Sequence, residues 1–443
     1  MNLSQDRLTF RTRRNLPYRL MLWAILILAG LWVTVQVETG QIEPIGLFEP
    51  TPTSTRTAIS FQGEAEAFLQ AGNLNKAIDA YADALLAEPE NSLLMAEMAR
   101  VLVYSSALQT SDADKAERLE RALEIINRAV EISPRDSYVH GIRAFVLDWN
   151  ANSTLISSET REDFLFQAEQ SAGIAVQLDA NNVLAQVYFA EVQLDQFKWS
   201  AAQQTIESVL ENDPHLMDAY RVHGLVLETL GLYEQAIAEY ERAAELAPNM
   251  TFLYLRIGFN YRTLALKQND ATSPTAQKWY GLALEFFAKA VAINNAIDVQ
   301  DPTPYLAIAK TYAQQGEFFI AARNAERALE INPTDPNTYG QLGIIYVQAR
   351  NYETAVGVLK CATYGCTAAE NEVGGVDVVG LSLTSLEVAF YYVQYGSVLS
   401  GLDFCPQAFP VLDDVERAFG DNTVIAAIVA EDREVCRILA EGE

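Results

Sequence analysis

The residues whose chemistry depends most on spacing are the four cysteines, Cys361, Cys366, Cys405 and Cys436. Oxidation would join them into two disulfides, for which three pairings exist. A zinc site is disfavoured, because the spacing lacks a C-x2-C pair and no histidine lies nearby. A catalytic thiol is disfavoured as well, since no histidine follows His223 to act as its base. Four free buried thiols remain the alternative to disulfides.

The histidines and the known catalytic motifs add little. His140 and His223 lie on apolar helical stripes and are predicted to pack between helices, whereas His215 follows a proline and is predicted to sit in a solvated turn. The sequence contains no G-x-S-x-G, P-loop, G-x-G-x-x-G or H-E-x-x-H motif, and its carboxylates are scattered over helix faces. We therefore expect no catalytic residue, metal ligand or cofactor, and hence no enzyme.

The elements that must position these residues repeat with a period of 34 residues. Pro214 and Pro248 are one period apart, and so are Ala202 and Ala236. The same offset relates a later set of four residues to its copy: Tyr305, Ala309, Tyr312 and Ala321 recur as Tyr339, Gly343, Tyr346 and Ala355. A fixed period of this size indicates an array of repeats.

Each repeat is predicted to be a pair of helices. The unit at 217–250 places Tyr220, Gly224 and Leu227 on one helical stripe and Tyr240 on a second. Small residues occur where two helix backbones must approach closely, and large residues fill the space between helices. A proline closes several units, because proline cannot continue a helix.

This pattern resembles the tetratricopeptide repeat family, and more narrowly its membrane-anchored bacterial members. The first unit carries the match on Phe61, Ala65, Phe68, Gly72, Ala77, Tyr81, Ala84 and Pro89. Eight units cover 58–367, and 384–419 could form a ninth, divergent unit before a capping helix. The resemblance implies an all-α fold, a right-handed α-solenoid of about eight to nine helix pairs. Units two, three and six carry extra residues near 106–116, 150–162 and 264–276, which could be helix extensions or loops.

In this family the first helices of successive units line a groove that binds peptides or partner proteins. The corresponding residues here are Tyr138, Phe145, Trp149, Tyr188, Glu191, Asp195, Arg221, Glu228, Phe252, Arg256, Phe259, Arg262 and Lys310. Aromatic and arginine side chains dominate the energetics of many interfaces. Because its basic residues gather in the second half, we predict that the groove binds an acidic and apolar partner segment across units three to seven. The alternative is that Phe145, Phe252 and Phe259 only pack between helices.

The N-terminal residues differ from the repeats. Residues 20–37 form an uncharged, apolar run that spans about 27 Å as a helix, close to a hydrocarbon core of about 30 Å. Five arginines precede this run, so the positive-inside rule predicts a cytoplasmic tail over 1–19 and a body outside the cytoplasm. A cleavable signal peptide is the alternative. A linker rich in proline and threonine over 38–57 would lead to the repeats.

The C-terminal residues, 368–443, are predicted to hold the divergent unit and its capping helix. Helices over 406–419 and 422–439 should run antiparallel about a turn at 420–421, which brings Cys405 level with Cys436. That arrangement leaves Cys361 to pair with Cys366. An extracytoplasmic location would permit both disulfides.

The net charge of −27 disfavours nucleic acid as a partner, because phosphate contacts need a basic surface. The sequence therefore predicts a single-pass membrane scaffold that touches the lipid bilayer through its N-terminal helix. Its groove would bind a protein or peptide during assembly or stabilisation of an envelope or secretion complex. The alternatives are a carbohydrate-binding or enzymatic site near 367–410, and a protein secreted after signal cleavage.

Overall fold

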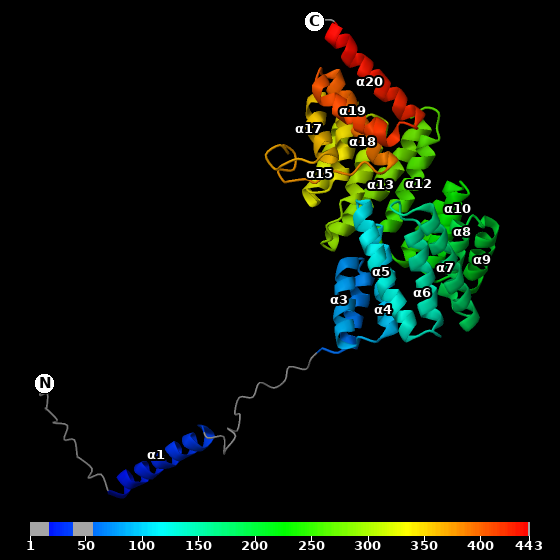
Figure 1. The fold of residues 1–443 in the computed structure, drawn as a ribbon. Coiled ribbons are helices and arrows are strands. Elements are labelled where there is room, and N and C mark those ends of the chain that lie inside the picture. Colours follow the sequence, from blue (N-terminus) through cyan, green and yellow to red (C-terminus); the bar gives the residue numbers. More distant parts are fainter. Residues whose placement is uncertain (1–16, 39–55, 442–443) are drawn as a thin grey trace, which may run out of the picture. The chain divides into compact units, whose positions relative to one another are not determined.

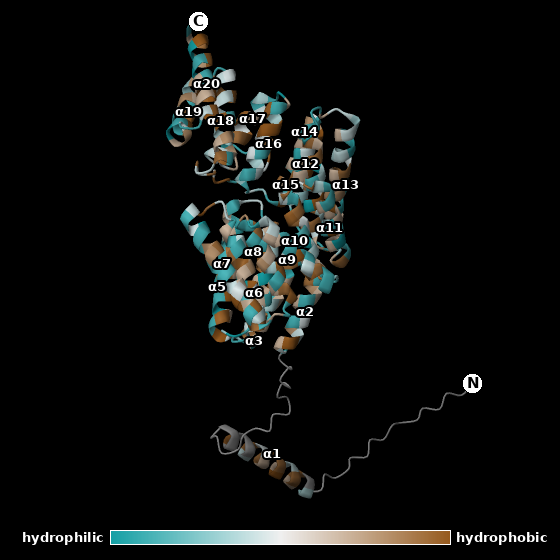
Figure 2. Cartoon of the chain, turned by 90° about the vertical axis from the view of Figure 1, so that its right-hand side faces the viewer, coloured by the Kyte–Doolittle hydropathy of each residue, from teal (hydrophilic) through white to brown (hydrophobic). Residues whose placement is uncertain are grey.

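The computed structural model describes residues 17–38 and 56–441, and within them twenty helices and no strand are present (Figure 1). The chain divides into two units, Met1–Arg56 and Thr57–Glu443. The second unit is an all-helical solenoid whose helices combine apolar and polar residues (Figure 2). This confirms the predicted all-α fold class.

The only helix of the first unit is, among its described residues, α1 (Pro17–Glu38), which contains the predicted apolar run. Across residues 17–38 and 56–441, no helix combines the length and the apolar content that crossing a membrane requires. The predicted transmembrane helix, and the orientation inferred from it, are therefore not supported. The predicted tail over 1–16 and most of the predicted linker lie outside the described residues.

The second unit consists of nine successive helix pairs and a final helix. The first helices of the pairs are α2 (Ala58–Gln70), α4 (Ser92–Ser106), α6 (Ser137–Ala151), α8 (Val183–Asp195), α10 (Met217–Thr229), α12 (Thr251–Leu266), α14 (Thr303–Gln315), α16 (Pro336–Gln348) and α18 (Leu386–Gly401). The second helices are α3 (Leu74–Ala87), α5 (Asp112–Ile132), α7 (Ser158–Leu178), α9 (Trp199–Asn212), α11 (Tyr233–Leu246), α13 (Pro274–Ala296), α15 (Phe318–Ile331), α17 (Tyr352–Thr363) and α19 (Cys405–Phe419). The chain ends in α20 (Thr423–Glu441), which packs on α18 and α19.

Glycines of the first helices allow close packing on the second helices. A Cβ added to Gly258 would lie 2.3 Å from the ring of Phe287, and one added to Gly343 would lie 2.5 Å from Leu359. Gly396 meets Leu412 in the same way at 2.8 Å. Because Gly343–Leu359 and Gly396–Leu412 have the same separation along the chain, α18 and α19 continue the repeat as a ninth unit.

The short turns inside six of the pairs contain a left-handed residue. Gly72, Gly231 and Gly316 occupy this turn with φ of 82°, 77° and 83°. Phe197, Arg350 and Asp403 occupy it in units four, eight and nine with φ of 62°, 59° and 64°. A side chain in this conformation costs roughly 1–2 kcal/mol, so the solenoid geometry overrides local preference in those three units.

The extra residues of units two, three and six lengthen the second helix of each unit. Helices α5, α7 and α13 have 21, 21 and 23 residues, whereas α3 and α11 have 14. A serine caps the start of each long helix with its side chain: Ser111, Ser157 and Ser273. The insertions are therefore mainly helix extensions, preceded by short turns.

The solenoid contacts itself across large sequence separations. The α2–α3 turn meets the start of α12, where Asn249 donates a hydrogen bond to the Gln70 carbonyl at 3.0 Å. The segment between α4 and α5 reaches two further helices: Thr303 donates to the Leu108 carbonyl at 3.2 Å, and Asn337 donates to the Thr110 carbonyl at 3.2 Å. These contacts join units one and two to units five to eight.

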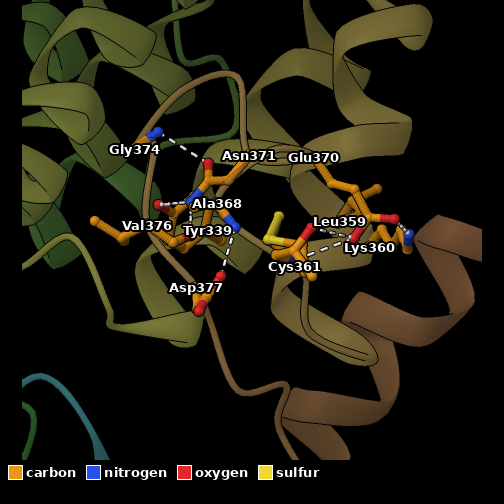
Figure 3. Close-up of a disulfide and its surroundings, with 12 residues drawn as sticks. Tyr339, Leu359, Lys360, Cys361, Ala368, Glu370, Asn371, Gly374, Val376 and Asp377 are labelled. Atoms are coloured by element: carbon orange, nitrogen blue, oxygen red, sulfur yellow. Dashed lines mark hydrogen bonds and ion pairs between the residues drawn. A yellow bond between two sulfur atoms is a disulfide. The ribbon is translucent and has the colours of Figure 1, made fainter.

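The loop between α17 and α18 is ordered by a disulfide and a side-chain network (Figure 3). Cys361 is bonded to Cys366, and the backbones of Cys366 and Val378 exchange two hydrogen bonds. Asn371 donates to the hydroxyl of Tyr339 at 2.7 Å and so ties the loop to α16. The network fixes the path of the chain into residues 381–385, immediately before α18.

A second disulfide joins Cys405, at the start of α19, to Cys436 on α20. Both pairings are those inferred from the sequence, and the described residues contain no free cysteine. In this structure α20 is thus linked covalently to the ninth unit that it caps.

Candidate functional site

The aromatic residues predicted for the first half of the groove lie in the interior. Phe145 and Tyr188 are fully buried and stack with ring centroids 4.3 Å apart. Tyr104, which the sequence analysis did not include, stacks on Phe252 at 5.5 Å and also contacts Phe145. These side chains pack between helices α4, α6, α8 and α12. The prediction that Phe145, Tyr188 and Phe252 contact a partner is therefore wrong, because the winding of the solenoid brings the first helices together.

The charged residues of the same region neutralise one another. Arg221 makes two hydrogen bonds to the Glu191 carboxylate, at 2.8 and 2.7 Å, and a third to Asp218 at 3.0 Å. Tyr104 donates to Asp218 at 2.6 Å, and Trp149 donates to Glu191 at 3.2 Å. Arg221 and Glu191 are only 5% and 2% exposed.

This arrangement controls the ionisation of Arg221. Burial alone would lower its pKa, but the carboxylates of Glu191 and Asp218 raise it well above the ordinary value. The guanidinium therefore stays charged inside the solenoid. Arg221 and Glu191, both predicted to meet a partner, are instead buried and hydrogen-bonded to each other inside the solenoid.

A pair of acidic residues lies beside this network. Asp148 is 1% exposed, and neither of its carboxyl oxygens has a hydrogen-bond donor. Burial and the nearby charges of Asp195 and Glu191 raise the pKa of Asp148 well above the ordinary value. Asp195, a predicted groove residue, accepts a hydrogen bond from Asn152 and is partly exposed. Asp148 thus belongs to the interior, and Asp195 lies at its edge.

Three more predicted groove residues are held by contacts inside the chain. The hydroxyl of Tyr138 donates to Glu97. Glu228 accepts hydrogen bonds from Tyr240 at 2.9 Å and from Asn260 at 3.0 Å. Arg256 lies 3.6 Å from the same carboxylate, with its guanidinium over the Tyr240 ring. These contacts tie neighbouring units together.

The remaining predicted residues, Phe259, Arg262 and Lys310, line an open cavity of about 510 Å³, called here the first cavity. Its walls come from α12, α14, α16, the start of α18 and the segment between α4 and α5. The other wall residues are Ala107, Gln109, Thr110, Ser111, Asp112, Ala113, Lys115, Leu155, Thr303, Leu306, Ala307, Asn337, Gln341, Leu381, Ser382, Thr384, Ser385, Glu387 and Val388. The segment 107–115 forms one side of this cavity through its contacts with α14 and α16.

Arg262 is held in the first cavity by two aromatic rings. Its guanidinium lies 5.0 Å from the centroid of Phe259 and 5.8 Å from that of Phe287, and it donates to the Ala307 carbonyl at 3.4 Å. Burial lowers the pKa of Arg262 to about 10. Packing around the ammonium group and the Arg262 charge lower the pKa of Lys310, an exposed residue in the middle of α14. Both side chains remain cationic at neutral pH.

A second cavity, of about 360 Å³, adjoins the first along α14, α16 and α18. The two cavities share Lys310, Gln341 and Glu387. The other residues of the second cavity are mostly apolar or uncharged: Ala313, Gln314, Ile344, Ile345, Gln348, Phe390 and Tyr391. A charged compartment is thus continuous with a more apolar one on the first helices of units seven, eight and nine.

The histidines form no catalytic or metal site. His140 is buried and its Nε2 lies 3.0 Å from the Pro134 carbonyl, His223 lies 3.4 Å from Glu239, and His215 is exposed. Within residues 17–38 and 56–441, no group of three His, Cys, Asp or Glu side chains is arranged to hold a metal ion.

Comparison with known proteins explains this architecture. Residues 179–251 and residues 324–357 each match a family model described as Tetratricopeptide repeat. These two segments are tetratricopeptide repeats. The first segment covers α8 to α11, which are units four and five, and the second runs from within α15 to within α17.

Several solved structures are similar to this chain. The human IFIT1 dimer with PPP-AAAA is 15% identical with a TM-score of 0.53, over 86% of this chain and 83% of that chain. Yeast Tom70 is 12% identical with a TM-score of 0.45, over 87% and 90%. A tetratricopeptide repeat protein from Parabacteroides merdae is 16% identical with a TM-score of 0.42, over 61% and 93%. A search of curated proteins found no match.

Several residues that line the two cavities escaped the sequence analysis. Gln341, Glu387 and Phe390 line the cavities, but their units lay beyond the range assigned to the groove. The repeat pattern indicated a ninth unit over 384–419, but its first helix, α18, was not assigned to the groove. The segment 107–115 had no such signal, because its approach to α14 and α16 follows from the curvature of the whole array.

Proposed function

We propose that this protein is an interaction scaffold that binds an extended segment of a partner protein in the first and second cavities. Tetratricopeptide repeats bind protein or peptide partners, and the first helices are the surfaces on which such partners lie. The observation that carries the proposal is the continuity of two open cavities on α12, α14, α16 and α18. The site is thus moved toward the C-terminus relative to the one predicted from sequence.

The two disulfides support a location in an oxidising compartment outside the cytoplasm. Such a location fits the proposed role in assembly or stabilisation of an envelope or secretion complex. The alternative of a carbohydrate-binding or enzymatic site near 367–410 has less support. Asp377 accepts a backbone hydrogen bond inside the loop, and Tyr391 and Tyr392 are buried with their hydroxyls bonded to Asn337 and to backbone carbonyls.

A bulky side chain introduced into the second cavity tests this proposal. Peptides would be selected on the full chain from a random library of about 12 residues, and their affinities measured by fluorescence polarisation. Ala313→Phe places a ring in the second cavity and should raise the Kd of the selected peptides at least tenfold. The matched control is Ala238→Phe, because Ala238 is exposed on α11. Equal affinities for both variants, or failure to select any peptide, would contradict the proposal.

A further inference from the structure

The first cavity contains two cations that no carboxylate neutralises. Within residues 56–441, neither Arg262 nor Lys310 forms an ion pair, although the protein carries a net charge of −27. The other arginines predicted for the groove, Arg221 and Arg256, are both close to a carboxylate. Arg262 and Lys310 therefore differ from the remaining groove cations in having no acidic partner.

Of the two acidic residues in the cavity wall, Asp112 is already paired, whereas Glu387 forms no ion pair in the part of the chain that the structure describes. Asp112 lies 3.3 Å from Lys115 and accepts a hydrogen bond from Thr154 at 2.7 Å. Glu387 is near Lys310 but lies too far away for an ion pair, and its nearest hydrogen-bond contact is the Tyr391 hydroxyl at 3.5 Å. The wall thus holds three cations and two anions, and one of these cations, Lys115, is paired with Asp112.

The starts of four helices border this cavity. The first turns of α5, α14, α16 and α18 contribute to its wall, through Ala113, Thr303, Asn337 and Val388. A side chain already accepts a hydrogen bond from an N–H group at each start: Ser111, Asp301, Asp335 and Ser385. The positive character of the cavity therefore comes from the side chains of Arg262 and Lys310.

The surroundings of Arg262 and Lys310 disfavour their charged forms in the absence of an anion. The pKa of Arg262 falls to about 10 through burial, and that of Lys310 falls through packing and the neighbouring Arg262 charge. An oxyanion placed between the two would stabilise both charged forms. Because segment 107–115 covers one side, the interaction would also be less screened by salt than a surface pair.

We infer that the first cavity binds the carboxylate of an acidic side chain of the partner segment, while a neighbouring apolar side chain enters the second cavity. This inference rests on the proposed function and specifies the chemistry of the partner. The cavity holds about 510 Å³, which is enough for one side chain with part of its backbone. The shared residues Lys310 and Gln341 place the acidic and apolar side chains close together in the partner sequence.

The peptide selection described above tests the inference through composition. Peptides selected on the full chain should be enriched in Asp or Glu within a few positions of an aliphatic or aromatic residue. Selection on the Arg262→Gln, Lys310→Gln variant should lose the acidic enrichment. The matched control is Arg323→Gln with Arg327→Gln, which removes two exposed charges from α15 and should retain it. Circular dichroism would verify that both variants fold.

A double-mutant cycle tests whether the carboxylate of the peptide contacts Arg262 and Lys310. Replacing the acidic residue of a selected peptide by Gln or Asn should raise its Kd at least tenfold on the native chain but less than twofold on the Arg262→Gln, Lys310→Gln variant. Equal losses on both chains, or selected peptides without acidic enrichment, would overturn the inference. If such peptides are still blocked by Ala313→Phe, the proposed function survives while the acidic specificity fails. Displacement of the peptide by inorganic phosphate at a lower concentration than by glutarate would indicate a phosphate site and also overturn it.

Discussion

Replacing Gly258 by alanine should destabilise the repeat array, because α12 and α13 leave no room for a methyl group at this point. The added Cβ would lie 2.3, 2.7 and 2.8 Å from three atoms of the Phe287 ring. Carbon atoms in favourable contact stay about 3.5–4.0 Å apart. The ring or the helix must therefore move by roughly 1 Å, and Phe287 is fully buried with no route into solvent.

Two opposing effects set the magnitude of this change. Overpacking a close-packed core costs about 1–3 kcal/mol, and the size of the overlap with a buried ring places Gly258→Ala in the upper part of that range. Alanine returns about 1 kcal/mol through its higher helix propensity. The net loss in the free energy of unfolding should be about 1–2 kcal/mol.

A matched control isolates the packing effect. Gly281 lies on α13 with no atom within 4 Å of the position of an added Cβ, so Gly281→Ala should stabilise by up to about 1 kcal/mol. Urea unfolding of both variants, followed by circular dichroism, should separate them by about 2–3 kcal/mol. Phe287→Leu should lower the free energy of unfolding less in the Gly258→Ala background than in the native chain. Equal stability of the two alanine variants would refute the assignment of Gly258 as a forced close approach.

Three further predictions concern two buried charged residues and one turn of the solenoid. In thermal melts, Asp148→Asn should gain stability relative to the native chain as pH rises from 5 to 8. The pKa of Asp148 is raised in the folded state, so folding favours the protonated carboxyl and the native chain loses this stabilisation as pH increases. A stability difference that does not change with pH would contradict this. Arg221→Met should lower the free energy of urea unfolding by about 3–5 kcal/mol, because it leaves the Glu191 and Asp218 carboxylates buried without their partner. A near-neutral effect would show that Arg221 does not stabilise the interior and would favour its predicted role in partner binding. Arg350→Gly should raise the free energy of unfolding by up to about 1 kcal/mol, and with it the melting temperature, since glycine accepts the φ of 59° without strain. A loss of stability would show that Arg350 is not strained.

Much of the fold was predictable because the repeat pattern is local. The stripe of Tyr220, Gly224 and Leu227 and the stripe of Tyr240 lie within one helix pair, where a fixed spacing determines which side chains meet. The disulfide between Cys405 and Cys436 could be predicted for the same reason, since two adjacent antiparallel helices bring both residues to one level. The ninth unit was less visible, because the long loop before α18 interrupts the period.

The candidate site was predictable only in part. Arg262, Phe259 and Lys310 line the first cavity as expected, whereas Arg221 and Phe145 are buried. All five stand on first helices, so their sequence positions do not distinguish them. The difference arises from how tightly the solenoid winds over units two to six compared with units six to nine.

The sequence by itself determined the class of architecture: an array of helix pairs whose small and large residues alternate with a fixed period, with cysteines able to join its C-terminal end. Only the tertiary structure decided which face is open. The bonds from Thr303 to Leu108 and from Asn337 to Thr110 connect residues about two hundred positions apart, and they depend on the summed rotation of all the intervening units. A small change of angle in each pair adds up over the array, so the enclosure of Arg221 and the accessibility of Arg262 are properties of the whole solenoid.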